Sequence, residues 1–223
     1  VQYMSRKQLE KSIERTKKLM QEAAKKLDFI EAAQYRDEVL KMEELLKDRR
    51  GNLTLTNING LCRIALDKLK KTYEQDIQEK NIRIVFDNLT LSLMMEVNVE
   101  QFSKVLAGIL KNSMYALLKK SETVTFSPEI FLGLKVNKDM LEITIRDNGS
   151  GIDENIKDKI FAPFFTTKTT GEAAGVGLYL CREIVQNHRG TIEVESKKGE
   201  YTQFLITIPV YQPKTITPPK EEE

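Results

Sequence analysis

The sequence reads Asp147-Asn148-Gly149-Ser150-Gly151-Ile152 directly after a run of alternating apolar and polar residues at 141–146. Alternation with a period of two predicts a strand, and the glycines predict a loop whose backbone can approach a ligand closely. A carboxylate at the end of that strand can accept a hydrogen bond from the amino group of a purine. Taken alone, the same pattern is typical of an ordinary loop, so the neighbouring segments decide between these interpretations.

A strongly periodic helix is predicted upstream, over residues 99–118, with its apolar residues on one side. It contains Gln101-Phe102-Ser103-Lys104-Val105-Leu106-Ala107-Gly108-Ile109-Leu110-Lys111-Asn112-Ser113. The amide oxygen of Asn112, held on a rigid helix, suits a magnesium ion that bridges phosphates. In isolation, Asn112 would be interpreted as an exposed helical asparagine.

Two further segments follow the glycine-containing loop. The first reads Ile160-Phe161-Ala162-Pro163-Phe164-Phe165-Thr166-Thr167-Lys168, and the second runs from Gly171 to Gly175-Val176-Gly177-Leu178, before a predicted helix. We expect Phe161 and Phe164 to pack in the core. Amides at the start of a helix bind phosphate through unpaired donors and the helix dipole, although a lone Gly-x-Gly is weak evidence.

In this order and spacing, the four segments resemble the catalytic, ATP-binding domain of sensor histidine kinases, which shares its fold with gyrase-type ATPases. The resemblance covers about residues 53–210. It implies ATP or ADP and Mg²⁺ as cofactors, with Asn112 as the metal ligand and Asn112 and Lys168 as the catalytic residues. The cofactor-binding residues that it implies are Asn112, Asp147, Gly149, Gly151, Ile152, Phe165, Gly175, Val176, Gly177, Leu178 and Thr202.

The resemblance also implies an activity and partners. Kinases of this family transfer the γ-phosphate to a histidine in a separate dimerising hairpin, so a phosphoacceptor hairpin and a response regulator are expected. That histidine is absent here, because the only histidine, His188, follows the last predicted helix and is interpreted as structural. The chain alone is therefore not expected to phosphorylate itself.

Three positions depart from the family's pattern. Gly108 stands where the kinases usually carry a second asparagine and the ATPases a glutamate that acts as general base, so water activation lacks an obvious agent. Ala173-Ala174 replaces the common Gly-Thr, and Tyr201 replaces a usual glycine. These replacements predict weaker phosphate binding.

The expected fold is α+β, a two-layer sandwich of helices on a mixed sheet (the Bergerat fold), preceded by an antiparallel helical hairpin. The hairpin is predicted because no proline or glycine occurs in residues 5–48, and apolar residues recur at helical spacing on both sides of a break near residues 27–30. Asp28 can cap the second helix. We expect a hairpin at 1–50, an ATP-binding domain at 51–210, and a disordered tail or linker at 211–223.

Residues 9–37 of the hairpin resemble the UVR motif. That motif ends the helicase subunit of bacterial nucleotide excision repair, where it docks a matching hairpin of the nuclease subunit. The resemblance implies self-association or binding of another UVR-type hairpin through residues 5–48, with Phe29 at the hairpin tip as a contact. A generic charged hairpin is the alternative, and the sequence leaves open whether the junction is natural or engineered. A nucleotide-gated interaction adaptor therefore stands beside the kinase interpretation.

Composition narrows the remaining possibilities. Lysine and arginine total 35 against 33 acidic residues, and this net charge of +2 gives no reason to expect direct nucleic-acid binding. Cys62 and Cys181 lack metal-ligand spacing and suit a reducing, cytoplasmic location. No apolar run is long enough to span a bilayer. Because the sequence does not begin with methionine, we expect an excised piece or an engineered fusion, from which a membrane-anchored sensor region could be missing.

Overall fold

The computed structural model describes residues 6–26, 28–50, 53–167 and 176–210. The helices are α1 (Arg6–Lys25), α2 (Phe29–Arg50), α3 (Ile58–Thr72), α4 (Glu74–Glu79), α5 (Val99–Ser121), α6 (Glu154–Lys157) and α7 (Gly177–Asn187). The strands are β1 (Thr54–Asn57), β2 (Arg83–Asp87), β3 (Met94–Val97), β4 (Glu129–Asn137), β5 (Met140–Asp147), β6 (Thr191–Lys197) and β7 (Tyr201–Pro209).

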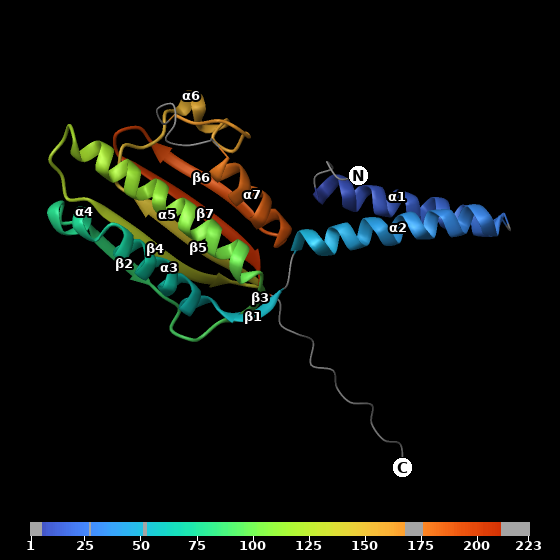
Figure 1. The fold of residues 1–223 in the computed structure, drawn as a ribbon. Coiled ribbons are helices and arrows are strands. Elements are labelled where there is room, and N and C mark those ends of the chain that lie inside the picture. The colour runs from blue at the N-terminus through green and yellow to red at the C-terminus, as the bar shows by residue number, and fades with distance from the viewer. Residues whose placement is uncertain (1–5, 27, 51–52, 168–175, 211–223) are drawn as a thin grey trace, which may run out of the picture.

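Five strands form a mixed sheet in the order β2-β4-β5-β7-β6. The β2–β4 pair is parallel, whereas β4–β5, β5–β7 and β6–β7 are antiparallel. The helices α3, α5 and α7 lie together on one face of this sheet (Figure 1). A separate antiparallel ribbon, β1–β3, lies at the end of the sandwich. The predicted two-layer α+β sandwich is confirmed.

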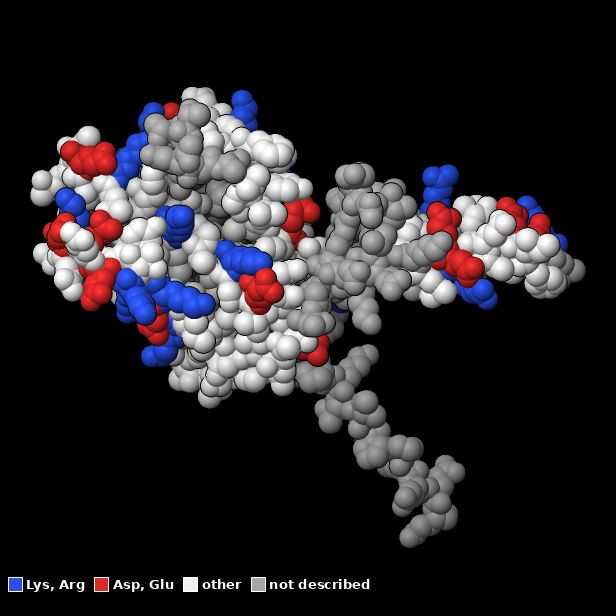
Figure 2. All heavy atoms as spheres, viewed as in Figure 1, with Lys and Arg blue, Asp and Glu red and all other residues white. Residues whose placement is uncertain are grey.

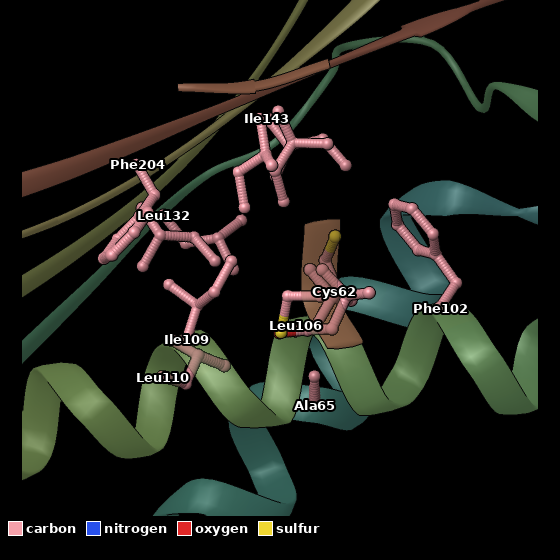
Figure 3. Packing of buried hydrophobic residues seen from close by; sticks show 14 of the residues in the cluster. Cys62, Ala65, Phe102, Leu106, Ile109, Leu110, Leu132, Ile143 and Phe204 are labelled. Carbon is pink, nitrogen blue, oxygen red and sulfur yellow. The ribbon is translucent and has the colours of Figure 1, made fainter. Parts of the chain in front are cut away.

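The core lies between α5 and the sheet. Figure 3 shows Leu106, Ile109 and Leu110 on α5, with Ile109 pointing toward Leu132 of β4 and Phe204 of β7. All three α5 residues are fully buried, as the predicted helical spacing requires. At about 25 cal/mol per Å² of apolar surface removed from water, this layer is a main source of stability. This packing also determines which face of α5 is turned toward the end of β5 and the start of β7.

Local signals explain where α5 begins. The Asn98 side chain accepts a hydrogen bond from the amide of Gln101 at 2.9 Å, which satisfies one of the unpaired donors of the first turn. The helix then runs to Ser121, slightly beyond the predicted residue 118. The short helices α4 and α6 were not predicted, because one or two turns carry too little periodicity to be seen in the sequence.

The N-terminal hairpin is confirmed as two antiparallel helices, and it projects from the sandwich near the end of α7 (Figure 1). The predicted cap is present, since Asp28 Oδ1 accepts from the amide of Glu31 at 3.0 Å. Ile13, Ala23 and Val39 are buried between the helices. At the tip, by contrast, Phe29 is 68% exposed and Ile30 is 77% exposed.

Candidate nucleotide-binding site

A cavity of about 460 Å³ opens between α5, the ends of β5 and β7, and the start of α7. This volume lies within the range of small-molecule sites. Its wall mixes apolar side chains with a few polar ones. The described lining residues are Asn112, Ser113, Tyr115, Ala116, Lys119, Asp147, Ser150, Gly151, Ile152, Asp153, Ile156, Ile160, Phe165, Thr166, Thr167, Val176, Gly177, Leu178, Lys198, Thr202 and Phe204.

The inner end of the cavity is formed by two residues on neighbouring strands. Asp147 ends β5 and pairs directly with Thr202 of β7, so both side chains lie on the same face of the sheet. Both are buried, with 2% and 4% exposure. Burial raises the pKa of Asp147 to about 6, against the lowering effects of the Ser113 hydroxyl, the Gly149 amide and the charge of Lys120. The carboxylate is therefore held in a partly desolvated place where a hydrogen bond to a ligand is strong.

The loop after Asp147 is held in one conformation by contacts on both sides. The amide of Gly149 donates to Asp147 Oδ1 at 3.0 Å, and the amide of Ser150 donates to the carbonyl of Ala116 on α5 at 3.2 Å. Gly151 has φ of 63°, and a Cβ there would collide with the carbonyl oxygen of Lys197. Glycine is therefore required at 151 by conformation as well as by space.

Hydrogen bonds through Ser196 hold Thr202 and the loop at Ile152 in place. Ser196 Oγ donates to the carbonyl of Tyr201 at 2.7 Å and accepts from the amide of Ile152 at 2.8 Å. It also lies 3.2 Å from Thr202 Oγ1. Because the single hydrogen of Ser196 is used on Tyr201, Thr202 must be the donor in this last contact. Thr202 then offers only lone pairs to the cavity.

The outer end of the cavity brings α5 and α7 together. Asn112 of α5 and Gly177, the first residue of α7, line the same space. The cap residue Val176 makes no side-chain hydrogen bond to the first turn, so its own side chain satisfies none of the amides at this helix start. Two lysines, Lys119 of α5 and Lys198, also line the cavity, and Figure 2 shows basic side chains over α5. This end of the site suits an anion.

Most of the predicted site residues lie on the cavity wall. Those are Asn112, Asp147, Gly151, Ile152, Phe165, Val176, Gly177, Leu178 and Thr202. Gly149 is not on the wall and acts through its hydrogen bond to Asp147; a Cβ there would press on Ala116 at 2.7 Å. Lys168 and Gly175 fall outside the described residues, as do Ala173 and Ala174.

One expectation about the phenylalanine-rich segment is wrong. Phe161 is buried as predicted, with its ring edge-on to Phe204, but Phe164 is 79% exposed. Phe164 follows Pro163 in a turn and has φ of 64°, so neither helical nor strand periodicity applies to its side chain. Phe165, the next residue, lines the cavity instead.

Sequence reasoning also missed Ser113, Tyr115 and Ala116, which follow Asn112 on the cavity side of α5. Ser113 carried a usable signal. It continues the buried face of α5 that runs through Leu106, Ile109 and Leu110, and a serine on an apolar face needs a polar partner.

Comparison with known proteins agrees with this geometry. The family of histidine kinase-, DNA gyrase B- and HSP90-like ATPases matches residues 98–212, and the UvrB/UvrC motif matches residues 10–45. The chain belongs to this ATPase family. Its hairpin resembles the UvrABC system protein B of Bacteroides fragilis, at 80% identity over 49 residues, 22% of this chain and 7% of that protein.

The ATPase region resembles histidine kinases in particular. The sensor histidine kinase ZraS of Salmonella typhi is 28% identical over 172 residues, which cover 77% of this chain and 34% of ZraS. The nucleotide-free catalytic domain of histidine kinase ThkA superposes with a TM-score of 0.58 at 28% identity, covering 71% of this chain and 95% of that domain. The chain thus carries a UvrB-like hairpin followed by a histidine-kinase-type ATPase domain. It spans about a third or less of the length of these curated relatives.

Within this ATPase family, the structure gives a physical account of two departures. A Cβ at Gly108 would lie 3.2 Å from Cys181 Sγ, so glycine lets α5 and α7 approach closely. Tyr201 lies away from the cavity, where its hydroxyl donates to Glu195 and Arg146 lies 4.4 Å from its ring centre. Neither residue lines the cavity.

His188 has a structural environment. It is 9% exposed, and the amide of Asn98 donates to its Nε2 at 3.0 Å. Nε2 is therefore unprotonated, and the proton on Nδ1 donates to the carbonyl of Ile184 at 2.8 Å. Both ring nitrogens are engaged.

Two kinds of feature are absent from the described residues. No helix among them is long and apolar enough to cross a membrane. No group of three or more histidine, cysteine or acidic side chains is arranged in that part of the chain to hold a metal ion.

Proposed function

We propose that the chain binds ATP with Mg²⁺ in this cavity and supplies the γ-phosphate to a histidine of a separate phosphoacceptor hairpin. The observation that carries the proposal is one cavity that is lined by a buried carboxylate, Asp147, and also by Asn112 and the start of α7. A nucleotide would fit these groups with its base at Asp147 and its phosphates near Asn112 and α7.

Features of the described residues fit the purine. Asp147 Oδ1 accepts from the amide of Gly149, and the carboxylate, which lines the cavity, would also accept from the adenine amino group. Ile152, Phe165 and Leu178 provide apolar wall for the ring. The conformation of Gly151 lets the loop backbone approach the base.

The outer end fits phosphates and a magnesium ion. Magnesium is usually bound through one or two protein oxygens together with substrate phosphates, so Asn112 alone is a sufficient protein ligand. Bound there, the ion would neutralise phosphate charge. The amides at the start of α7, at Gly177 and Leu178, would orient the phosphates, and we assign Lys168 and Gly175 to the same task from the resemblance.

The contribution of the protein to transfer is binding, orientation and exclusion of water, because positioning and charge neutralisation dominate phosphoryl transfer. Gly108 offers no carboxylate to activate water. His188 has both nitrogens engaged and is nearly buried, which supports its structural role. The acceptor histidine must then come from another domain, and a response regulator would receive the phosphate from it.

We further propose domain boundaries at residues 50 and 210, and docking of another UVR-type hairpin, or a second copy, through residues 5–48. The exposure of Phe29, Ile30 and Leu40 supports this docking. The same observation favours the second candidate function, in which the domain is a nucleotide-gated adaptor with little catalysis. A sensor region in a longer protein would account for any membrane attachment.

The test is calorimetry of the full chain with MgADP. The parent is expected to bind, and Asp147→Asn should weaken binding by about ten- to a hundredfold, since hydrogen bonds to charged groups contribute about 1.5–3 kcal/mol. Asp139→Asn, an exposed residue of the β4–β5 turn, is the matched control and should bind as the parent does. Equal affinities for the parent and Asp147→Asn would refute the adenine assignment.

A further inference from the structure

Ser113 is a buried hydroxyl group at the inner end of the cavity that the proposed function does not use. Its side chain lines the cavity, yet the residue is only 1% exposed. No described residue makes a hydrogen bond of standard geometry with its Oγ. A buried hydroxyl without a hydrogen-bond partner lowers stability by about 1–3 kcal/mol. We therefore expect the hydroxyl on the apolar face of α5 to have a partner when the cavity is occupied.

Two other polar residues on the cavity wall, Asp147 and Thr202, act as acceptors. Asp147 lies close enough to be affected by the hydroxyl: burial raises the pKa of Asp147 to about 6, and Ser113 works against that rise. Thr202 has given its hydrogen to Ser196 and presents lone pairs. Of these three polar groups, only Ser113 has a hydrogen to donate to a ligand.

Adenine presents the complementary pattern. Its amino group donates, and the ring nitrogens on either side of that group accept. Guanine carries an accepting oxygen in place of the amino group, and of the two flanking ring nitrogens N1 donates while N7 accepts. An accepting carboxylate beside a donating hydroxyl therefore matches adenine and opposes guanine.

We propose that Ser113 is an adenine-recognition residue, whose hydroxyl donates to a ring nitrogen flanking the amino group while Asp147 accepts from the amino group. This inference rests on the proposed nucleotide function and adds a second, independent reading of the base. It also accounts for the unpaired hydroxyl, because the ligand completes the hydrogen bond that the free protein lacks.

The experiment compares the parent with Ser113→Ala against three diphosphates: ADP, 1-deaza-ADP and 7-deaza-ADP. Each deaza analogue keeps the amino group and replaces one flanking ring nitrogen by carbon. For ADP, Ser113→Ala is expected to weaken binding about three- to tenfold, the range of one neutral hydrogen bond. For one of the two analogues, the parent and the variant should bind equally, because the acceptor has gone.

Two controls separate recognition from folding. Ser121→Ala removes another hydroxyl of α5, one that donates to the carbonyl of Leu117 and does not line the cavity, and it should leave all three affinities unchanged. The thermal midpoint of nucleotide-free Ser113→Ala should equal or exceed that of the parent, since the hydroxyl it removes is unpaired.

The other outcomes overturn the inference in distinguishable ways. Equal ADP affinity for the parent and Ser113→Ala would refute it while leaving the nucleotide function intact. The same loss for ADP and both analogues would mean that Ser113 acts through Asp147 or the packing of α5, and not on the base. Failure of the parent to bind ADP at all would remove the proposed function together with the inference.

Discussion

The hairpin and the sandwich belong to one chain, but contacts of very different range stabilise them. In the hairpin, Ile13 and Val39 pack between two helices that are adjacent in sequence. In the sandwich, Asp147 pairs with Thr202 and Asn98 bonds His188, 90 residues away. The hairpin leaves an aromatic side chain, Phe29, exposed at its tip, whereas the sandwich forms a cavity with buried polar side chains on its wall. This difference agrees with the proposal that the hairpin acts through its surface and the sandwich through its interior.

The largest expected effect concerns which protein receives the γ-phosphate of ATP, because this tests whether the chain holds the nucleotide site without an acceptor histidine. Incubated with magnesium and γ-labelled ATP, the full chain is expected to gain no acid-labile phosphate, because neither region offers an accessible histidine. Adding a cognate phosphoacceptor hairpin should produce label on that hairpin alone. Gel autoradiography before and after acid treatment measures both.

His188 provides the control for the labelling experiment. If the chain labels itself and His188→Gln removes the label while circular dichroism shows an intact fold, the structural interpretation of His188 is wrong. The division between an interior that binds ATP and an acceptor on another domain would then fail.

A smaller effect is expected from the buried carboxyl group of the sandwich. Below about pH 4, Asp147 is protonated in both the folded and unfolded states. Since its folded pKa is raised to about 6, the native state loses stability as pH rises from about 4 to 6, where only the unfolded state ionises freely. Asp147→Asn should therefore stabilise the nucleotide-free protein by an amount that grows by about 1 kcal/mol between pH 5 and 7.5.

Urea unfolding at the two pH values measures this difference. Asp139→Asn should show no such change, because Asp139 is exposed. The hairpin should contribute nothing to the effect, since no carboxyl group is buried among its described side chains. A pH-independent gain for Asp147→Asn would mean that the carboxyl group is not desolvated in solution.

The sequence predicted elements well where a local pattern was long and had clear ends. The strand that ends at Asp147 and the helix after the Gly-Val-Gly segment were both predicted and are both present, because strict alternation marks the first and a glycine start marks the second. The parallel pairing of β2 with β4 leaves no such mark, since it depends on chain packing over long distances. The prediction that Phe164 packs in the core was wrong because a turn, and not a repeating pattern, sets the direction of its side chain.

The residues of the candidate site also differ in whether a local sequence pattern could predict them. Asp147 and Asn112 were predicted from motifs, and the structure places both on one cavity. Ser113 and the hydroxyl chain from Thr202 to Ile152 depend on which groups face one another across the fold. A single sequence gives the residue types, but it does not show which of these side chains lie within hydrogen-bond distance of one another.

The smallest effect concerns the hairpin tip. Phe29→Ser removes an exposed aromatic ring, so the free energy of unfolding should change by less than about 0.5 kcal/mol. If the tip is a docking surface, association of the full chain, or its binding to a peptide of residues 1–50, should weaken by about tenfold, since central aromatic contacts typically contribute over 1 kcal/mol. Sedimentation equilibrium measures this, while MgADP affinity should stay the same. Leu55→Ser, an exposed leucine on β1 of the sandwich, is the matched control and should leave association unchanged. Association that survives Phe29→Ser, or that Leu55→Ser weakens equally, would mean that the hairpin tip is not the interacting surface and that the two regions do not divide their roles as proposed.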